Sequence, residues 1–252
     1  MSESLDVLTS KIRKLFEDNV KGKKEDVAQY VQQHDGKGGH WLEKQMGVPH
    51  NSRNAPDLFG FEMKKHSRCK TTFGDWSPDR RTKLWGSSTA GVFLSSFGSP
   101  NIAKAGRLSW SGAVFPRVGP SNYAGQKLVV DSADNIIAMY SYSKDCRPDK
   151  NSLVRSHWQS EDLHLCTWLS SDMRTKVEKK FNNNGWFRCI ADTDGIYVDI
   201  QFGDPFTFAT FITLVRSGDI ICDCGMHQGN ARPYMNWRAH NTIWDRLANG
   251  GV

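Results

Sequence analysis

The alternation of side chains over residues 57–64 constrains the fold most strongly. Every second residue from Phe59 to Met63 is apolar, and Glu62 and Lys64 stand in the positions between and after them. Successive side chains of a β-strand point to opposite faces, so this period predicts a strand with one buried and one charged face. Such a strand needs a sheet with a core on one side, which excludes an all-helical protein.

The remaining segments mix helices and strands. Apolar residues at helical spacing predict helices over residues 4–19, 171–181 and 205–216, and a short helix ending at Gly47. Hairpins are predicted over 126–131 with 135–142 and over 186–191 with 195–202, and a short strand over 219–225. Residues 70–125, rich in Gly, Ser and Pro, support only short strands and loops. Strict strand–helix alternation is absent, so we predict an α/β (α+β) fold, a central mixed sheet flanked by helices.

Composition narrows the class of protein. The chain has 252 residues, 38% of them hydrophobic, and a formal net charge of +6, which excludes intrinsic disorder and small disulfide-stapled scaffolds. No apolar run approaches the roughly 20 residues of a membrane span, and the N-terminus lacks the pattern of an export signal. Six scattered cysteines are typical of a reducing compartment. We therefore expect a cytoplasmic protein with no membrane partner.

Positive charge concentrates between residues 62 and 83. This segment has seven basic residues against three acidic ones, namely Lys64, Lys65, Arg68, Lys70, Arg80, Arg81 and Lys83 against Glu62, Asp75 and Asp79. Such a cluster is the electrostatic pattern that favours a polyanion. Taken alone, it is more typical of a solvated face.

The acidic residues beside this cluster form a possible metal site. Pro56 and Asp57 precede Glu62 and Lys64, in the pattern P-D-x4-E-x-K. Two carboxylates around one point suit Mg²⁺, which keeps its other positions for water and phosphate oxygens. A neighbouring lysine then orients the attacking water or neutralises charge in the transition state. The alternative is an exposed ion pair on an edge strand.

The acidic–lysine pattern occurs a second time, in a segment predicted to be helical. Asp172, Glu178 and Lys180 also match the pattern, but they fall in the helix predicted over residues 171–181. Positions i and i+2 of a helix do not share a face. We therefore interpret the second match as accidental.

The neighbourhood of the first match resembles a known family. The segments GGHWLEKQMG and APDLFGFEMKKH contain a G-x-x-L-E helix, a Pro-Asp turn and an E-x-K-x-H strand ending at His66. This order resembles the MutH-like PD-(D/E)XK nucleases, which include the MvaI and BcnI type of type II restriction endonucleases. Residues 217–223 and the segment reaching Arg238 are similar to the family's late strand and its basic recognition loop.

The resemblance implies a function and a set of roles. The fold would be a restriction-endonuclease-like domain over residues 1–252, with a catalytic lobe over about 1–120 and a lobe containing the DNA-recognition segment over about 121–252. The activity would be Mg²⁺-dependent hydrolysis of duplex DNA at a short sequence, leaving 5′-phosphate ends, with Mn²⁺ or Ca²⁺ able to replace Mg²⁺ in binding. Asp57 and Glu62 would bind the metal, Lys64 would position the water, and Glu43 would be an accessory acid.

Residues that would contact DNA follow from charge and from the same resemblance. They are Lys65, His66, Arg68 and Lys70 beside the acidic pair, and His227, Arg232 and Arg238 near the C-terminus. Arginine bound to guanine is the commonest base contact, although a solvated surface position is an equal alternative for each arginine.

The partners that this function implies are double-stranded DNA and, in the cell, a DNA methyltransferase that protects host sites, and the resemblance favours a monomer. Two other functions stay open. One is a MutH-like mismatch-repair nicking enzyme that needs an activating protein, and the other is a DNA-binding module without catalysis.

Overall fold

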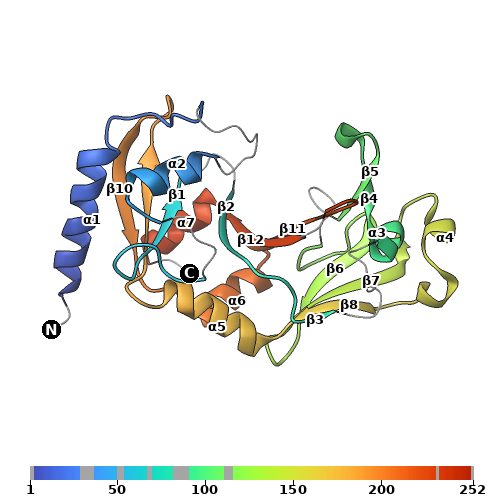
Figure 1. Cartoon of the computed structure of the whole chain (residues 1–252). Coiled ribbons are helices and arrows are strands. Elements are labelled where there is room, and N and C mark those ends of the chain that lie inside the picture. The colour runs from blue at the N-terminus through green and yellow to red at the C-terminus, as the bar shows by residue number, and fades with distance from the viewer. Residues whose placement is uncertain are drawn as a thin grey trace. The chain divides into compact units, whose positions relative to one another are not determined.

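The computed structural model describes seven stretches of the chain: residues 3–28, 37–49, 54–66, 70–81, 91–110, 116–230 and 233–250. They form two compact units, each assembled from segments that are far apart in the sequence (Figure 1). Unit 1 comprises Met1–Thr71, Lys176–Thr207 and His240–Val252, and unit 2 comprises Thr72–Thr175 and Phe208–Ala239. The units therefore differ from the predicted lobes over about 1–120 and 121–252, because local patterns in the sequence do not reveal which distant segments pair.

Unit 1 contains a three-stranded sheet in the order β1-β9-β10. Its strands are β1 (Glu62–Lys65), β9 (Trp186–Ala191) and β10 (Tyr197–Gly203). β1 runs parallel to β9, with Glu62 opposite Trp186 and Lys64 opposite Arg188. β9 and β10 form the hairpin that the sequence predicts. The acidic–basic strand is therefore an edge strand of this sheet, held by a partner more than one hundred residues later.

The core of unit 1 lies on the apolar face of β1. Phe61 and Met63 are buried there with Phe187, against side chains of two helices. The helices are α1 (Leu5–Asn19), which buries Ile12 and Phe16, and α2 (Lys37–Gln45), which buries Trp41 and Leu42. The prediction of a helix over 4–19 is confirmed, and so is that of a short helix before Gly47. Two further helices belong wholly or partly to this unit, α5 (Ser170–Phe181) and α7 (Asn241–Ala248).

Unit 2 contains two sheets, in the orders β2-β12-β11-β5-β4 and β3-β8-β7-β6. The strands are β2 (Lys70–Asp75), β3 (Arg80–Arg81), β4 (Ser99–Asn101), β5 (Arg107–Trp110), β6 (Ala124–Val130), β7 (Ile136–Asp145), β8 (Leu163–Trp168), β11 (Ile220–His227) and β12 (Tyr234–His240). The helices are α3 (Gly91–Phe97), α4 (Lys150–Leu153) and α6 (Phe208–Arg216), with short 3-10 turns at Ile102–Lys104 and Ser156–Trp158. The predicted hairpin over 126–142 and strand over 219–225 are confirmed as β6–β7 and β11. The predicted α+β class, a mixed fold of sheets and helices, is confirmed for the chain.

One local prediction at the site is wrong. Residues 57–61 are not the start of the strand but a tight turn, in which the amides of Asp57 and Leu58 both donate to the carbonyl oxygen of Phe61. Phe59 has a positive φ of 48° and is 43% exposed, so it does not belong to the buried face. Gly60 follows with φ of 81°, where a Cβ would lie 2.7 Å from the side-chain amides of Asn183 and Asn184. Glycine is needed there for both conformation and space.

Among the described residues, no helix combines the length and the apolar character needed to cross a membrane.

Candidate active site

Glu62 and Lys64 lie together on the charged face of β1, as the alternation predicts. Nζ of Lys64 lies 2.6 Å from Oε1 of Glu62. This is not an exposed surface pair, because only 2% of the Glu62 side chain and 10% of the Lys64 side chain are accessible. The alternative of a solvated edge-strand pair therefore does not describe this site. A buried carboxylate beside a buried amine is costly to maintain for stability alone.

The turn over residues 57–61 brings Asp57 to the same place. Its Oδ2 accepts a hydrogen bond of 2.9 Å from the backbone amide of Met63, the residue between Glu62 and Lys64. Burial, followed by the negative charge of Glu62, raises the pKa of Asp57 to about 7. The structure thus brings Asp57, Glu62 and Lys64 together.

The protonation of Lys64 is also affected by this environment. Burial lowers the pKa of the Lys64 amine from its ordinary value, while the ion pair with Glu62 opposes that change. Its Nζ also lies 5.4 Å from the centre of the Phe181 ring. An amine whose pKa is lowered by burial is better able to exchange a proton near neutral pH than an exposed lysine.

A second lysine, Lys180 of α5, completes the cluster. Its Nζ lies 3.1 Å from Oε1 of Glu62, the same oxygen that Lys64 contacts, and 18% of its side chain is exposed. The sequence gives no role to Lys180, because Glu178 and Lys180 do not share a face of the predicted helix. Its actual partner, Glu62, lies 118 positions earlier in the chain. One signal was available: Lys180 follows the buried Val177 by three residues and precedes the buried Phe181, so it borders the face of α5 that packs inward.

The donor atoms of this site fit a divalent metal ion. Oε2 of Glu62 is buried and has no hydrogen-bond partner among the described residues. An ionised oxygen in that position is unfavourable unless something binds it. Hard carboxylate oxygens from Asp57 and Glu62 are the ligands that Mg²⁺ prefers, with water and phosphate oxygens to complete its shell. The residues present therefore suit the predicted magnesium ion.

Glu43, the predicted accessory acid, is carried by a helix whose buried residues pack beside β1. Glu43 lies on α2, and the buried neighbours Trp41 and Leu42 pack with Phe61 and Met63, on the face of β1 opposite Glu62. No hydrogen bond joins the Glu43 side chain to the acidic pair within the described part of the chain. Its role as an accessory acid stays a prediction.

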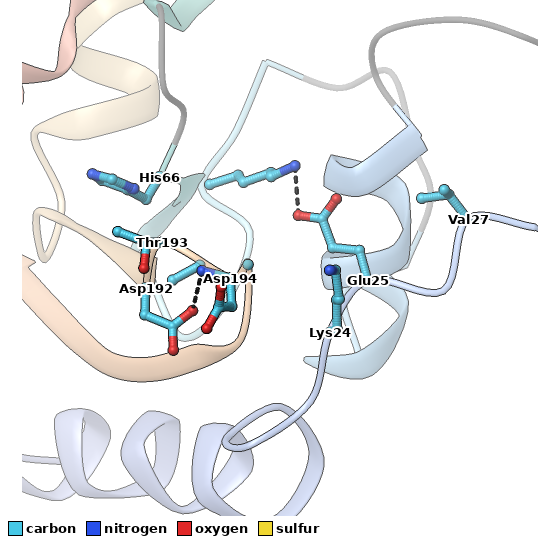
Figure 2. Close-up of a pocket in the computed structure, with 10 residues that line it drawn as sticks. Lys24, Glu25, Val27, His66, Asp192, Thr193 and Asp194 are labelled. Carbon is cyan, nitrogen blue, oxygen red and sulfur yellow. Dashed lines mark hydrogen bonds and ion pairs between the residues drawn. The ribbon is translucent and has the colours of Figure 1, made fainter.

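The residues predicted to bind DNA next to the site lie beyond Lys64. Lys65 points to the other face of the strand, where its Nζ lies 2.5 Å from Oε1 of Glu25. Both residues line a cleft of about 740 Å³ together with His66 and the turn between β9 and β10, including Asp192 and Asp194 (Figure 2).

The other three predictions beside the acidic pair have different outcomes. Nε2 of His66 lies 3.2 Å from the side-chain nitrogen of Asn241, and burial followed by Arg188 lowers the pKa of His66. The imidazole is therefore mainly neutral at pH 7, which weakens it as a phosphate contact. Lys70 begins β2 and is partly buried, and Arg68 lies outside the described residues.

The C-terminal predictions are only partly supported by geometry. His227 ends β11, and its Nδ1 lies 3.1 Å from the carbonyl oxygen of Gln228. The expectation that a recognition loop extends to Arg238 is wrong, because β12 begins at Tyr234 and pairs Arg238 with Ile221 of β11. The Arg238 guanidinium contacts Oδ2 of Asp223 at 2.7 Å and Oγ1 of Thr72 at 3.1 Å. Arg232 lies outside the described residues, and the DNA-reading roles stay predictions.

The fold and the acid–lysine cluster define a nuclease of the restriction-endonuclease class. The chain matches the family model of the LlaMI restriction endonuclease over residues 20–251, and it belongs to that family. It is 38% identical over 255 residues to the type II restriction enzyme ScrFI of Lactococcus lactis subsp. cremoris, an alignment that covers 92% of this chain and 94% of that enzyme. Its fold matches that of restriction endonuclease MvaI in complex with its cognate DNA substrate, with a TM-score of 0.64, 14% identity, and coverage of 100% of this chain and 98% of the other. The predicted resemblance to this group of nucleases is confirmed.

Proposed function

We propose that this protein is a type II restriction endonuclease that hydrolyses phosphodiester bonds of double-stranded DNA at a short sequence, with Mg²⁺ held by Asp57 and Glu62. The observation that carries the proposal is the buried cluster of Asp57, Glu62 and Lys64, in which Oε2 of Glu62 is left for a ligand that the described residues do not supply. Family membership and the relative named a type II restriction enzyme support the class of activity.

Each residue of the cluster has a chemical task in this proposal. Bound between the two carboxylates, Mg²⁺ would supply Lewis-acid polarisation of the phosphate and a lower pKa for bound water. Lys64 holds the attacking water in line and accepts or relays its proton, because burial has already lowered the pKa of its amine. The Met63 amide fixes the Asp57 carboxylate, and the tight turn over residues 57–61 fixes its backbone. The products are a 5′-phosphate and a 3′-hydroxyl end.

Family membership supports DNA as the substrate. Lys65 and Lys24 line the cleft of unit 1 beyond the end of β1, and Arg238 lies on β12 of unit 2. We propose that these basic residues contact the sugar–phosphate backbone or base edges, which is the usual division of work in DNA recognition. We also propose that the enzyme acts as a monomer in the cytoplasm, alongside a methyltransferase that modifies the same sequence in host DNA.

Incubation of the purified protein alone with plasmid DNA tests this function. Discrete double-strand fragments are expected with Mg²⁺, and none with EDTA. Labelling of the new ends by polynucleotide kinase should require prior phosphatase treatment, because the ends carry 5′-phosphates. Nicks that appear only after addition of a helper protein would favour the mismatch-repair alternative, and DNA binding without cleavage under any divalent ion would favour a non-catalytic module.

A further inference from the structure

Lys180 is held rigidly against Glu62 by the helix that carries it. The next residue, Phe181, is fully buried and packs against the rings of Phe206 and Trp244 at centroid distances of 5.7 and 6.3 Å. This anchorage keeps the last turn of α5 over the charged face of β1. The Lys180 side chain, mostly buried, ends 3.1 Å from Oε1 of Glu62. Its contact with the acidic pair is therefore part of the architecture and not a chance meeting of surface side chains.

The second lysine changes the formal charge of the cluster. Asp57 and Glu62 carry two acidic groups, and Lys64 and Lys180 carry two basic ones, all of them largely removed from water. The formal net charge of these four side chains is zero, and transfer of a proton between an acid and an amine within the cluster does not change it. Without Lys180 the same cluster would carry one net negative charge. In a poorly hydrated site, a difference of one charge strongly affects the free energy of binding a dication.

We propose that Lys180 is a built-in counter-ion of Glu62, which keeps the acidic pair neutral in the DNA-free enzyme and makes divalent-ion binding depend on the DNA phosphate. The inference rests on the function proposed above. A dication added alone would leave the neutral cluster with two uncompensated positive charges. A DNA phosphate contributes negative charge beside the same carboxylates, so ion and DNA stabilise each other. By thermodynamic linkage, DNA then raises the ion affinity by the factor by which the ion raises the DNA affinity.

Lys180 acts in this proposal through Glu62, so it is a positioning residue. The arrangement has a practical consequence for a nuclease. The DNA-free enzyme binds the divalent ion only weakly, and the complete metal site forms when DNA is bound. The proposal differs from a direct role of Lys180 in chemistry, because it predicts an effect on ion binding when no DNA is present.

Titration of the DNA-free protein with Mn²⁺, followed by the electron paramagnetic resonance of the free ion, tests the proposal. Lys180→Gln should bind Mn²⁺ about tenfold more tightly than the parent, and Lys180→Met should do the same. Lys180→Arg keeps the charge and should retain the weak parental affinity. Lys179→Gln is the matched control, because it removes the same charge from the exposed neighbour in the same helix, and it should bind Mn²⁺ as the parent does. Thermal melting confirms that each variant is folded, and either neutral variant suffices.

The coupling itself is measured with DNA binding in Ca²⁺ and in EDTA. The ratio of the two DNA dissociation constants should be large for the parent and Lys179→Gln, and smaller for Lys180→Gln. A Mn²⁺ affinity of the neutral variants that equals the parent's or falls below it, undetectable binding included, overturns the proposal. Failure of the parent to cut plasmid with Mg²⁺ would instead refute the proposed nuclease function, so the two failures are distinguishable.

Discussion

Each unit of the molecule contains a buried cluster of acids and bases, and the two clusters differ in how completely their atoms are paired. In unit 2, Arg147 donates from Nε and Nη2 to Asp145, from Nη1 to the carbonyl oxygen of Gly98, and from Nη2 to that of Ser96. The Tyr140 hydroxyl donates to Asp145 as well, at 2.9 Å. In unit 1, by contrast, Oε2 of Glu62 has no partner among the described residues, while Oε1 is shared by two lysines.

The difference in pairing appears in the pKa values. Burial alone would raise the pKa of Asp145, but the hydrogen bonds from Arg147 outweigh it and hold the pKa below its usual value. For Asp57, burial and the charge of Glu62 prevail and raise the pKa to about 7. A saturated cluster, in which the buried acid is fully paired, stabilises the fold. An unsaturated cluster, in which a buried oxygen has no partner, can still bind a ligand. The comparison therefore separates a structural from a functional set of buried charges.

The largest effect is expected at the unsaturated cluster. Glu62→Gln keeps the size of the side chain and one acceptor oxygen but removes the negative charge that the proposed ion requires. Plasmid cleavage with Mg²⁺ should fall by roughly a thousandfold, and the melting temperature should also fall, because the buried Lys64 and Lys180 lose their ionised partner. Gel-based cleavage rates measured beside a melting curve check both parts, and a variant that cuts at more than about a tenth of the parental rate contradicts the comparison.

At the saturated cluster the same kind of change should affect folding and not catalysis. Arg147→Met leaves Asp145 buried without its positive partner and removes the donor to the carbonyl oxygens of Ser96 and Gly98, which should lower the free energy of unfolding by about 3–5 kcal/mol. Urea unfolding measures this loss. The rate of DNA cleavage per folded molecule should stay at the parental level, and a selective loss of that rate in fully folded protein would show that Arg147 serves the active site.

The two clusters should also respond to pH in opposite directions. The pKa of Asp57 is raised from 3.8 to about 7, so its contribution to stability is complete below about pH 4 and is lost as the pH rises towards 7, by up to about 4 kcal/mol. Asp145, whose pKa is lowered, stabilises the folded protein at pH values above the ordinary pKa of an aspartate, and this stabilisation is lost in acid. Urea unfolding in EDTA, from pH 4.5 to 8, should show that Asp57→Asn lacks the loss at rising pH. Parallel curves for parent and variant would contradict the assignment.

The smallest effect is expected where an ion pair is only half buried. Lys65 and Glu25 retain 34% and 22% side-chain exposure, so Lys65→Gln should change the free energy of unfolding by less than about 1 kcal/mol. If Lys65 contacts a phosphate, the slope of log DNA affinity against log salt should fall by about one. Fluorescence anisotropy at several salt concentrations measures the slope, and an unchanged slope removes Lys65 from the DNA interface.

Local pattern was enough to predict the parts of the site that lie within a few residues of each other. Glu62 and Lys64 are two positions apart, so they share one face of a strand whichever sheet that strand joins. Asp57 was predicted to turn towards them, although the means differ, since Phe59 and Gly60 adopt a left-handed turn. The period of two continues through such a turn in the sequence, so a strand and a turn look alike there.

Long-range pairing explains what the sequence analysis missed. Lys180 reaches Glu62 only because β1 pairs in parallel with β9 and α5 precedes β9 in the chain. No sequence pattern indicated the contacts of Arg147, because two of its acceptors are the backbone carbonyl oxygens of Ser96 and Gly98, about fifty positions away. The same limitation applies to the two interleaved units, whose segments join through sheet pairings that no local period encodes.

The central claim is that the buried lysine of β1 works with the acidic pair to cut DNA, and the cleavage rate of Lys64→Ala measures it most directly. Beside the parent and Lys179→Ala, in which an exposed lysine of α5 is removed, Lys64→Ala should digest plasmid at least ~100-fold more slowly with saturating Mg²⁺, and Lys179→Ala should match the parent. Digestion by folded Lys64→Ala at the parental rate would contradict the account.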